Sequence, residues 1–71
     1  MMEEYIIFYA DKNPDTIEYD NDERFLFTNE TEAIKQANKW HKEEKGKYAC
    51  NQYVVYLFVD KKKVKKVYET V

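Results

Sequence analysis

Residues 29–46, NETEAIKQANKWHKEEKG, decide the fold, because they carry the local signals of one amphipathic helix. Asn29 is a favoured N-cap residue, and Glu32 stands three positions later, where it completes a capping box. Gly46, the only glycine in the chain, stands where a left-handed C-cap is expected. We therefore predict one helix that packs on a sheet, with Trp40 as its main core anchor. Its predicted buried stripe, set by helical spacing, contains Ala33, Ile34, Ala37, Trp40, His41 and Glu44.

Two apolar runs flank this helix and predict strands of the sheet. Residues 5–9, YIIFY, are β-branched or aromatic throughout, and both faces of the run are apolar or amphipathic. This pattern predicts a central strand. Residues 53–59, YVVYLFV, form the most strand-like run of the chain. A last strand is predicted over residues 64–70, where lysines would protect a sheet edge against aggregation.

The segment between the first strand and the helix predicts turns and shorter strands. Asn-Pro-Asp at 13–15 and the polar run 20–23 have turn chemistry. Residues 25–27, FLF, predict a firm strand, and residues 17–19 an optional short one that would complete a hairpin with it. The expected fold class is α+β in a single domain, residues 1–71. One antiparallel or mixed sheet of four to five strands carries one helix on one face, in the order β-(β)-β-α-β-β.

Strand alternation suggests where an interaction surface would lie. In the run 53–59, residues 53, 55, 57 and 59 share one face, and residues 54, 56 and 58 share the other. One helix covers only one face of such a sheet, so we expect the reverse face to be open and to carry several tyrosine rings. Tyrosine is enriched at protein interfaces and among binding hot spots. The interface candidates are Tyr5, Tyr9, Tyr53, Tyr56 and Tyr68, with coating of an open sheet as the alternative role.

Catalytic chemistry has little support in the sequence. Cys50 and His41 each stand alone, which excludes an internal disulfide and a Cys/His zinc cage. A Cys–His pair would also need an orienting third group and an oxyanion site, and the chain has no serine and no glycine-rich loop. We interpret His41 as a structural residue and Cys50 as a small apolar one. The sequence predicts that the protein is not an enzyme.

The acidic stretch 15–23 is the only candidate for a metal site. Asp20-Asn21-Asp22 is similar to the first residues of a calcium loop. However, the glycine and the distal bidentate glutamate of such a loop are missing. We therefore predict a solvated turn, with no metal and no cofactor.

The net charge of −2 conceals two halves of opposite sign. Residues 1–32 carry a net charge of −8, and residues 33–71 carry +6. The strongest basic cluster consists of Lys61, Lys62, Lys63, Lys65 and Lys66, which with nearby tyrosines could contact phosphates and stack on bases. The chain has a single arginine, the residue that makes most bidentate base and phosphate contacts, so a solvated hairpin is the simpler interpretation.

These observations lead to a functional hypothesis. No apolar run is long enough for a membrane span, and the acidic N-terminus with a lone thiol fits a cytoplasmic location. We expect a small non-enzymatic protein-interaction module, a regulator or inhibitor of the phage or mobile-element type that binds a larger host protein. Self-association into a homodimer is one form of that interface. The alternative is nucleic-acid binding through the lysine-rich C-terminal hairpin.

Overall fold

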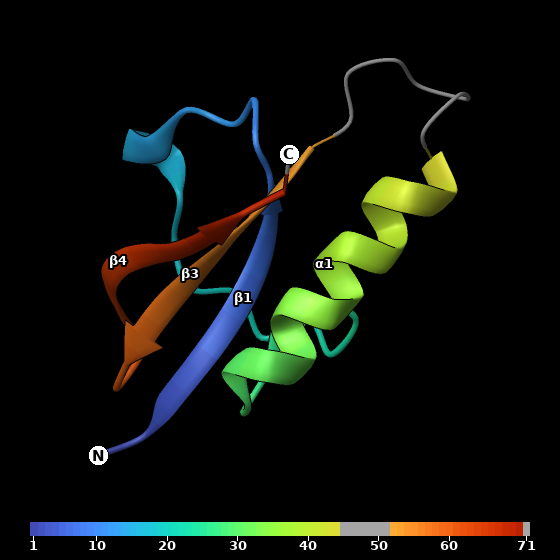
Figure 1. The fold of residues 1–71 in the computed structure, drawn as a ribbon. Helices are drawn as coiled ribbons and strands as arrows, with labels where there is room; N and C mark the ends of the chain where they lie inside the picture. The colour runs from blue at the N-terminus through green and yellow to red at the C-terminus, as the bar shows by residue number, and fades with distance from the viewer. Residues whose placement is uncertain (45–51, 71) are drawn as a thin grey trace.

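One α-helix packs on a four-stranded antiparallel sheet in the structure, a computed structural model that describes residues 1–44 and 52–70 (Figure 1). The strand order across the sheet is β2-β1-β3-β4, and the order along the chain is β-β-α-β-β. This confirms the predicted α+β fold. The elements are β1 (Glu3–Tyr9), the short 3₁₀ helix η1 (Pro14–Thr16), β2 (Leu26–Phe27), α1 (Glu30–Glu44), β3 (Tyr53–Val59) and β4 (Lys62–Glu69).

β1 and β3 form the centre of the sheet, which confirms the central position predicted for residues 5–9. They pair along their whole length, from Glu3 opposite Val59 to Tyr9 opposite Tyr53. A strand with a neighbour on each edge and cover on each face needs apolar side chains on both faces, which both runs supply. Just after β1, the N–H of Ala10 donates to the carbonyl of Gln52 at 2.9 Å. Backbone groups alternate in direction along a strand, so the N–H and C=O groups of the even-numbered residues of β1 point toward β3.

The connection between β3 and β4 is a two-residue turn with positive φ at both positions, 50° at Asp60 and 68° at Lys61. These are the signs of φ in a type I′ hairpin turn, whose twist matches that of the strands. The left-handed conformation is unfavourable for residues with a Cβ atom. Two hydrogen bonds tie the turn to the start of the chain: Met2 N–H donates to Asp60 Oδ1 at 3.0 Å, and Asp60 N–H donates to the Met2 carbonyl at 2.9 Å.

The helix begins where the capping signal predicts. Asn29 Oδ1 accepts a hydrogen bond from the backbone N–H of Glu32 at 3.1 Å. Ala33 and Ala37 are fully buried, so the helix approaches the sheet closely, and Trp40 packs beside them with its ring centroid 5.4 Å from that of Phe25. The predicted C-cap, Gly46, lies outside the described residues. Within residues 1–44 and 52–70, no helix has the length and apolar character needed to span a membrane.

The reverse face of the sheet is covered within the monomer, so the prediction of an open reverse face is wrong. Ile17 is only 4% exposed and packs with Ile6 and Phe58, and the ring of Tyr19 meets Phe58 edge-on at 5.9 Å. The Tyr19 hydroxyl lies 3.1 Å from both carboxylate oxygens of the buried Glu4 and donates to them. The segment that follows η1 therefore forms a third layer.

This covering segment has no regular structure, so the predicted short strand at 17–19 and its hairpin are also wrong. β2 pairs with β1 instead, with Leu26 opposite Ile6 and Phe27 opposite Tyr5. An extended backbone at 17–19 would need a neighbouring strand for its polar groups. Residues 17–19 instead run across the reverse face of the sheet, where the side chains of Ile17 and Tyr19 pack on it.

Candidate interaction site

The helix leaves part of its own side of the sheet uncovered. α1 packs against β1, β2 and β3, and the β3–β4 turn lies away from it (Figure 1). An apolar strip remains there, which consists of Tyr5, Leu57, Val59 and Val64. Tyr5 lies opposite Leu57, and Val64 occupies a bulge of β4 beside Leu57. Val64 is 52% exposed and the other three side chains are partly exposed.

The dimensions of the elements explain why this strip exists. A helix with its side chains is about 10 Å wide, whereas the outer strands of a four-stranded sheet lie about 14 Å apart. One helix therefore cannot cover the full width of the sheet, and α1 meets β4 only at its Tyr68 end. This limit could have been inferred from the sequence, since only one helix was predicted. From the sequence, we expected the open surface on the reverse face instead.

The lysines of the C-terminal hairpin divide between the two sides of the sheet. Lys63 Nζ donates to the Pro14 carbonyl at 2.7 Å, and Lys61 Nζ lies 5.8 Å from the ring centroid of Tyr19. Lys66 forms an ion pair with Glu69 at 2.8 Å, which raises the pKa of Lys66.

The two remaining lysines of the cluster border the apolar strip. Lys65 lies opposite Leu57 and Lys62 lies opposite Val59. Neither ammonium group has an ion pair or hydrogen bond among the residues that the structure describes. On the other side of Val59, Glu3 occupies the paired position on β1. The strip is thus an apolar centre with a mainly basic border.

The outer edge of β4 is a poor template for another strand. Phe58, Tyr56 and Val54 are two residues apart on β3, but their partners Lys63, Lys66 and Glu69 are three residues apart on β4. The two register shifts are bulges, and bulges together with lysines protect an edge against pairing. An incoming strand with a period of two would not match this edge. Contact at this end of the molecule is therefore expected through side chains rather than through strand addition.

The five tyrosines predicted as interface residues do not share one surface. Tyr5, Tyr53 and Tyr68 belong to the helix-side core, and Tyr53 is only 2% exposed. The Tyr68 hydroxyl donates to Asn38 Oδ1 of the helix at 2.9 Å. Tyr56 lies on the reverse face, edge-on to Phe8 at 5.9 Å. Tyr9 is half exposed, and its ring lies 5.3 Å from that of Tyr53.

Burial affects the ionisation of two tyrosines that lie on opposite faces. Burial, followed by the charges of Glu3 and Glu30, raises the pKa of Tyr5. Burial, followed by the hydrogen bond to Glu4 and its charge, raises the pKa of Tyr19. Both phenols therefore remain neutral at neutral pH. Tyr5 offers a ring and a neutral hydroxyl to a partner at the apolar strip.

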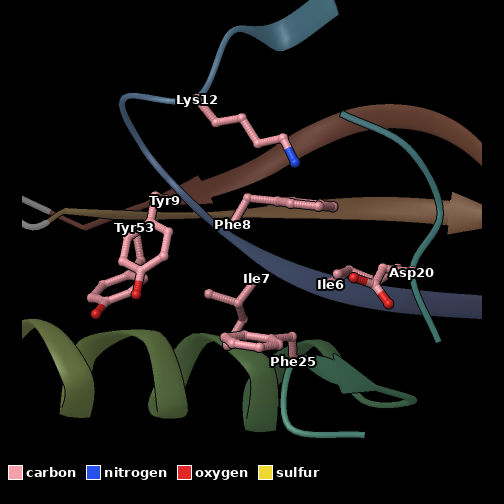
Figure 2. Close-up of a pocket in the computed structure, with 8 residues that line it drawn as sticks. All are labelled: Ile6, Ile7, Phe8, Tyr9, Lys12, Asp20, Phe25 and Tyr53. Carbon is pink, nitrogen blue, oxygen red and sulfur yellow. The ribbon is translucent and has the colours of Figure 1, made fainter. Parts of the chain in front are cut away.

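A hollow of about 190 Å³ lies beside β1, beyond the end of its pairing with β2 (Figure 2). Four consecutive β1 residues line it, although their side chains alternate between the two faces of the sheet. The hollow therefore lies against the edge of the strand. Lys12 extends over Phe8, with Nζ 5.4 Å from the ring centroid. The full lining is Ile6, Ile7, Phe8, Tyr9, Lys12, Asp20, Phe25 and Tyr53.

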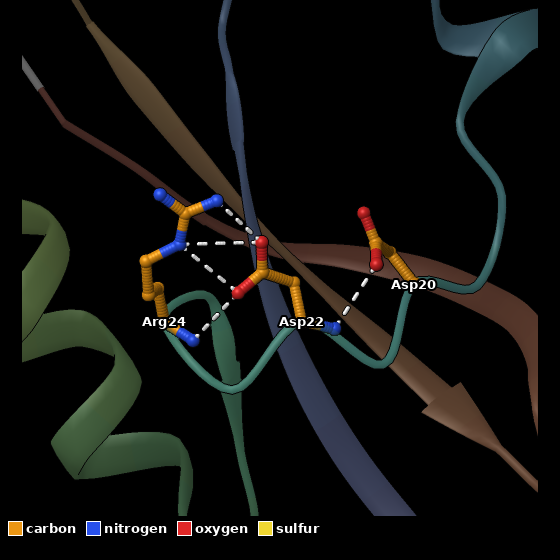
Figure 3. Close-up of polar contacts among 3 residues, drawn as sticks. All are labelled: Asp20, Asp22 and Arg24. Carbon is orange, nitrogen blue, oxygen red and sulfur yellow. Dashed lines mark hydrogen bonds and ion pairs between the residues drawn. The ribbon is translucent and has the colours of Figure 1, made fainter.

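The acidic turn is held by internal hydrogen bonds (Figure 3). Asp22 accepts bonds from Arg24 Nη2 at 2.7 Å and Nε at 3.1 Å, and its Oδ1 also accepts the Arg24 backbone N–H at 3.0 Å. These bonds lower the pKa of Asp22 to about 2. Asp20 Oδ1 accepts the backbone N–H of Asp22 at 3.0 Å. The described part of the chain contains no group of three or more acidic, histidine or cysteine side chains placed to hold a metal ion.

Of the two residues considered for nucleophilic chemistry, only His41 lies among the described residues. His41 is partly buried on α1. Cys50 lies outside the described residues, so the structure gives no distance between the two side chains. The sequence-based expectation that the protein is not an enzyme stays a prediction.

Comparisons with known proteins provide no functional assignment. A scan against protein-family models and searches of the curated proteins and of the solved structures find no match to this chain. The apolar strip and the hollow beside β1 are therefore the candidate binding features of the described residues.

Proposed function

We propose that this protein is a small non-enzymatic protein-interaction module that binds a larger protein through the apolar strip (Tyr5, Leu57, Val59 and Val64). The supporting observation is the 52% exposure of Val64 on the edge strand β4, beside Leu57 and away from the helix. Exposed apolar groups that cluster beside polar borders are typical of protein-binding surfaces. Such a module would act as a regulator or inhibitor by occupying a surface of its partner.

Charge indicates what kind of partner suits the strip. Lys62 and Lys65 stand beside it without an ion pair in the described fold, and they would meet acidic side chains around an apolar patch of the partner. A second copy of this chain suits the strip less well. In a symmetric dimer the same surface faces itself, so the lysines would approach one another. We therefore assign the strip to a different protein with an acidic border.

Size indicates how far the contact extends. A standard interface buries about 800 Å² on each partner, which is more than four side chains supply. The flanking lysines and Glu3 would therefore lie within the contact. Complete burial of a valine is worth about 1.5–3 kcal/mol, so covering the exposed half of Val64 contributes about 1 kcal/mol.

Nucleic-acid binding through Lys61, Lys62, Lys63, Lys65 and Lys66 has less support. The ammonium groups lie on both sides of the sheet, and three of them contact Tyr19, Pro14 and Glu69. A single basic stripe with open aromatic rings is the usual footprint of a single-strand binder. Titration with a single-stranded oligonucleotide at low salt separates the two functions, because only the nucleic-acid hypothesis predicts binding that falls steeply with salt.

The experiment compares partner capture by two matched glutamate variants. Val64→Glu places a charge in the strip, and Thr31→Glu makes the same change of charge at an exposed position in the first turn of α1. We expect the wild-type protein and Thr31→Glu to retain the same partner from a host lysate. Val64→Glu should bind that partner at least about tenfold more weakly, because it loses apolar burial and buries a charge.

Three outcomes would contradict this proposal. The first is equal capture by Val64→Glu and Thr31→Glu, with the fold of both checked by circular dichroism. The second is the absence of a stable partner at every salt concentration tested. The third is a concentration-dependent mass that Val64→Glu abolishes, which would place a second copy on the strip.

A further inference from the structure

We propose that the hollow beside β1 binds a small aromatic carboxylate. The Tyr9 backbone N–H and the Lys12 ammonium group hold the carboxylate, and the ring of the ligand packs on the aromatic side chains that line the hollow. This site lies at the opposite end of β1 from the apolar strip and does not depend on the proposed function.

The edge of β1 supplies a free backbone donor. Ile7 N–H donates to the Phe25 carbonyl at 3.0 Å, so the N–H groups of odd-numbered β1 residues point away from β3. Phe25 thus occupies the position opposite Ile7 and closes the hollow at that end. Its own N–H donates to the Asp22 carbonyl at 3.0 Å, where the chain turns away from β1. The next N–H on this edge, that of Tyr9, has no partner among the described residues.

Lys12 places a positive charge beside this donor. Its N–H donates to the Tyr9 carbonyl at 3.2 Å, so a tight turn brings the lysine back over the end of β1. Its Nζ lies 5.4 Å from the ring centroid of Phe8, the residue before Tyr9. The ammonium group forms no ion pair with any residue in 1–44 or 52–70. A carboxylate that accepts from a backbone N–H and an ammonium group makes short, charge-assisted hydrogen bonds.

The rings beside the hollow form one connected aromatic wall. The Tyr9 and Tyr53 ring centroids are 5.3 Å apart. Phe25 and Tyr53 both contact Trp40, at centroid distances of 5.4 and 5.7 Å. Figure 2 shows the rings of Tyr9, Tyr53 and Phe25 on one side of β1 and Lys12 on the other. Aromatic rings pack well on one another edge-on or offset, so this wall suits a flat aromatic ligand. The volume of 190 Å³ corresponds to about six water molecules, which is room for a single-ring carboxylate such as benzoate.

Asp20 determines which way the ligand lies. It lines the hollow at the Ile6 end, and its Oδ1 already accepts the Asp22 N–H at 3.0 Å (Figure 2). Its negative charge therefore favours a carboxylate at the Tyr9 end. The two free donors at that end also favour an anion over a cation. A small ligand in an open hollow predicts weak binding, with a dissociation constant of about 1–10 mM.

The test is a nuclear magnetic resonance titration of the isotope-labelled protein with three ligands that share one ring. Benzoate carries the negative charge, benzamide has the same shape without a charge, and phenyltrimethylammonium carries a positive charge. Benzoate should give its largest amide shift at Tyr9 and slow the hydrogen exchange of that amide. Benzamide should bind about threefold to tenfold more weakly, because it loses the ion pair and the charge-assisted bond. Phenyltrimethylammonium should not shift the Tyr9 amide.

Matched variants separate the charges that face the ligand. Lys12→Gln should weaken benzoate binding by about twofold to fivefold. Lys35→Gln removes the same charge from an exposed position on α1 and should leave binding unchanged. Asp20→Asn retains an acceptor for the Asp22 N–H and removes the negative charge, so it should strengthen benzoate binding by up to about twofold.

Several outcomes would overturn the proposal. Absence of a Tyr9 shift at about 50 mM benzoate would do so, because the expected dissociation constant is lower. Equal binding of benzoate and benzamide, or equal effects of Lys12→Gln and Lys35→Gln, would refute the anion contacts. Weaker benzoate binding by Asp20→Asn, or a Tyr9 shift with phenyltrimethylammonium, would refute the assigned charge. Val64 lies outside the hollow, so Val64→Glu should bind benzoate like the wild-type protein, and failure here would leave the proposed function intact.

Discussion

Replacing Ile17 by alanine tests whether the irregular segment after η1 is a structural layer of the protein. Ile17 is 4% exposed and packs with Ile6 and Phe58, so the substitution removes buried methyl and methylene groups and leaves a cavity. Such changes cost about 2–5 kcal/mol. A single irregular layer can partly collapse onto the sheet, so we expect about 2–3 kcal/mol. A 71-residue domain has a total stability of about 4–10 kcal/mol, so the loss is a large fraction.

Urea unfolding followed by circular dichroism and by Trp40 fluorescence measures this loss. The midpoint should fall while the slope stays constant, because the same surface is exposed on unfolding. The neighbouring Glu18 is exposed, so Glu18→Ala should change the unfolding free energy by less than about 0.5 kcal/mol. If Ile17→Ala does not fold, Ile17→Val should cost about 0.5–1.5 kcal/mol. An Ile17→Ala protein as stable as Glu18→Ala would refute the reasoning.

Two further predictions concern single hydrogen-bonded groups. Thr70→Val should lower the unfolding free energy by about 1–3 kcal/mol, because the Tyr53 N–H loses its acceptor, the fully buried Thr70 Oγ1 at 2.8 Å. Thr70→Ser keeps that acceptor and should recover most of the loss in the same urea experiment. The folded-state pKa of Asp22, about 2, lies below its ordinary value of 3.8, so its contribution to stability is present above about pH 4 and is lost as the pH falls toward 2. Arg24→Gln should raise that pKa toward the ordinary value in a carboxyl titration by nuclear magnetic resonance, and an unchanged titration near pH 2 would contradict the assigned cause.

The helix and the central strands could be predicted because their signals are local. Asn29 caps the helix that follows it, and the same residue pattern specifies this geometry in any context. The alternation in β3 is also correct, since Tyr53 and Val55 share the helix-side core while Phe58 belongs to the reverse face. Period-two alternation separates the two faces. It does not say which face the helix covers when both are apolar.

The cover of the reverse face could not be predicted because it depends on contacts between distant residues. Ile17 lies in a segment without a helical or strand period, and its position is fixed by packing on Phe58 and by the Lys63 bond to Pro14. The bulges of β4 could not be predicted either. They interrupt the alternation of side chains, so the adjacent residues Val67 and Tyr68 pack on the same side of the sheet. Because of the covering segment and the bulges of β4, the candidate surface is the apolar strip and not the reverse face.

The central claim is that the reverse face is closed while the end of the helix side is open. Methyl signals in the presence of a soluble paramagnetic agent test both parts in one measurement. We predict strong attenuation of the Val64 methyl signals and protection of the Ile17 and Ile6 methyl signals. Protection of Val64 together with attenuation of Ile17 would contradict the account, because the bare surface would then lie on the other side of the sheet.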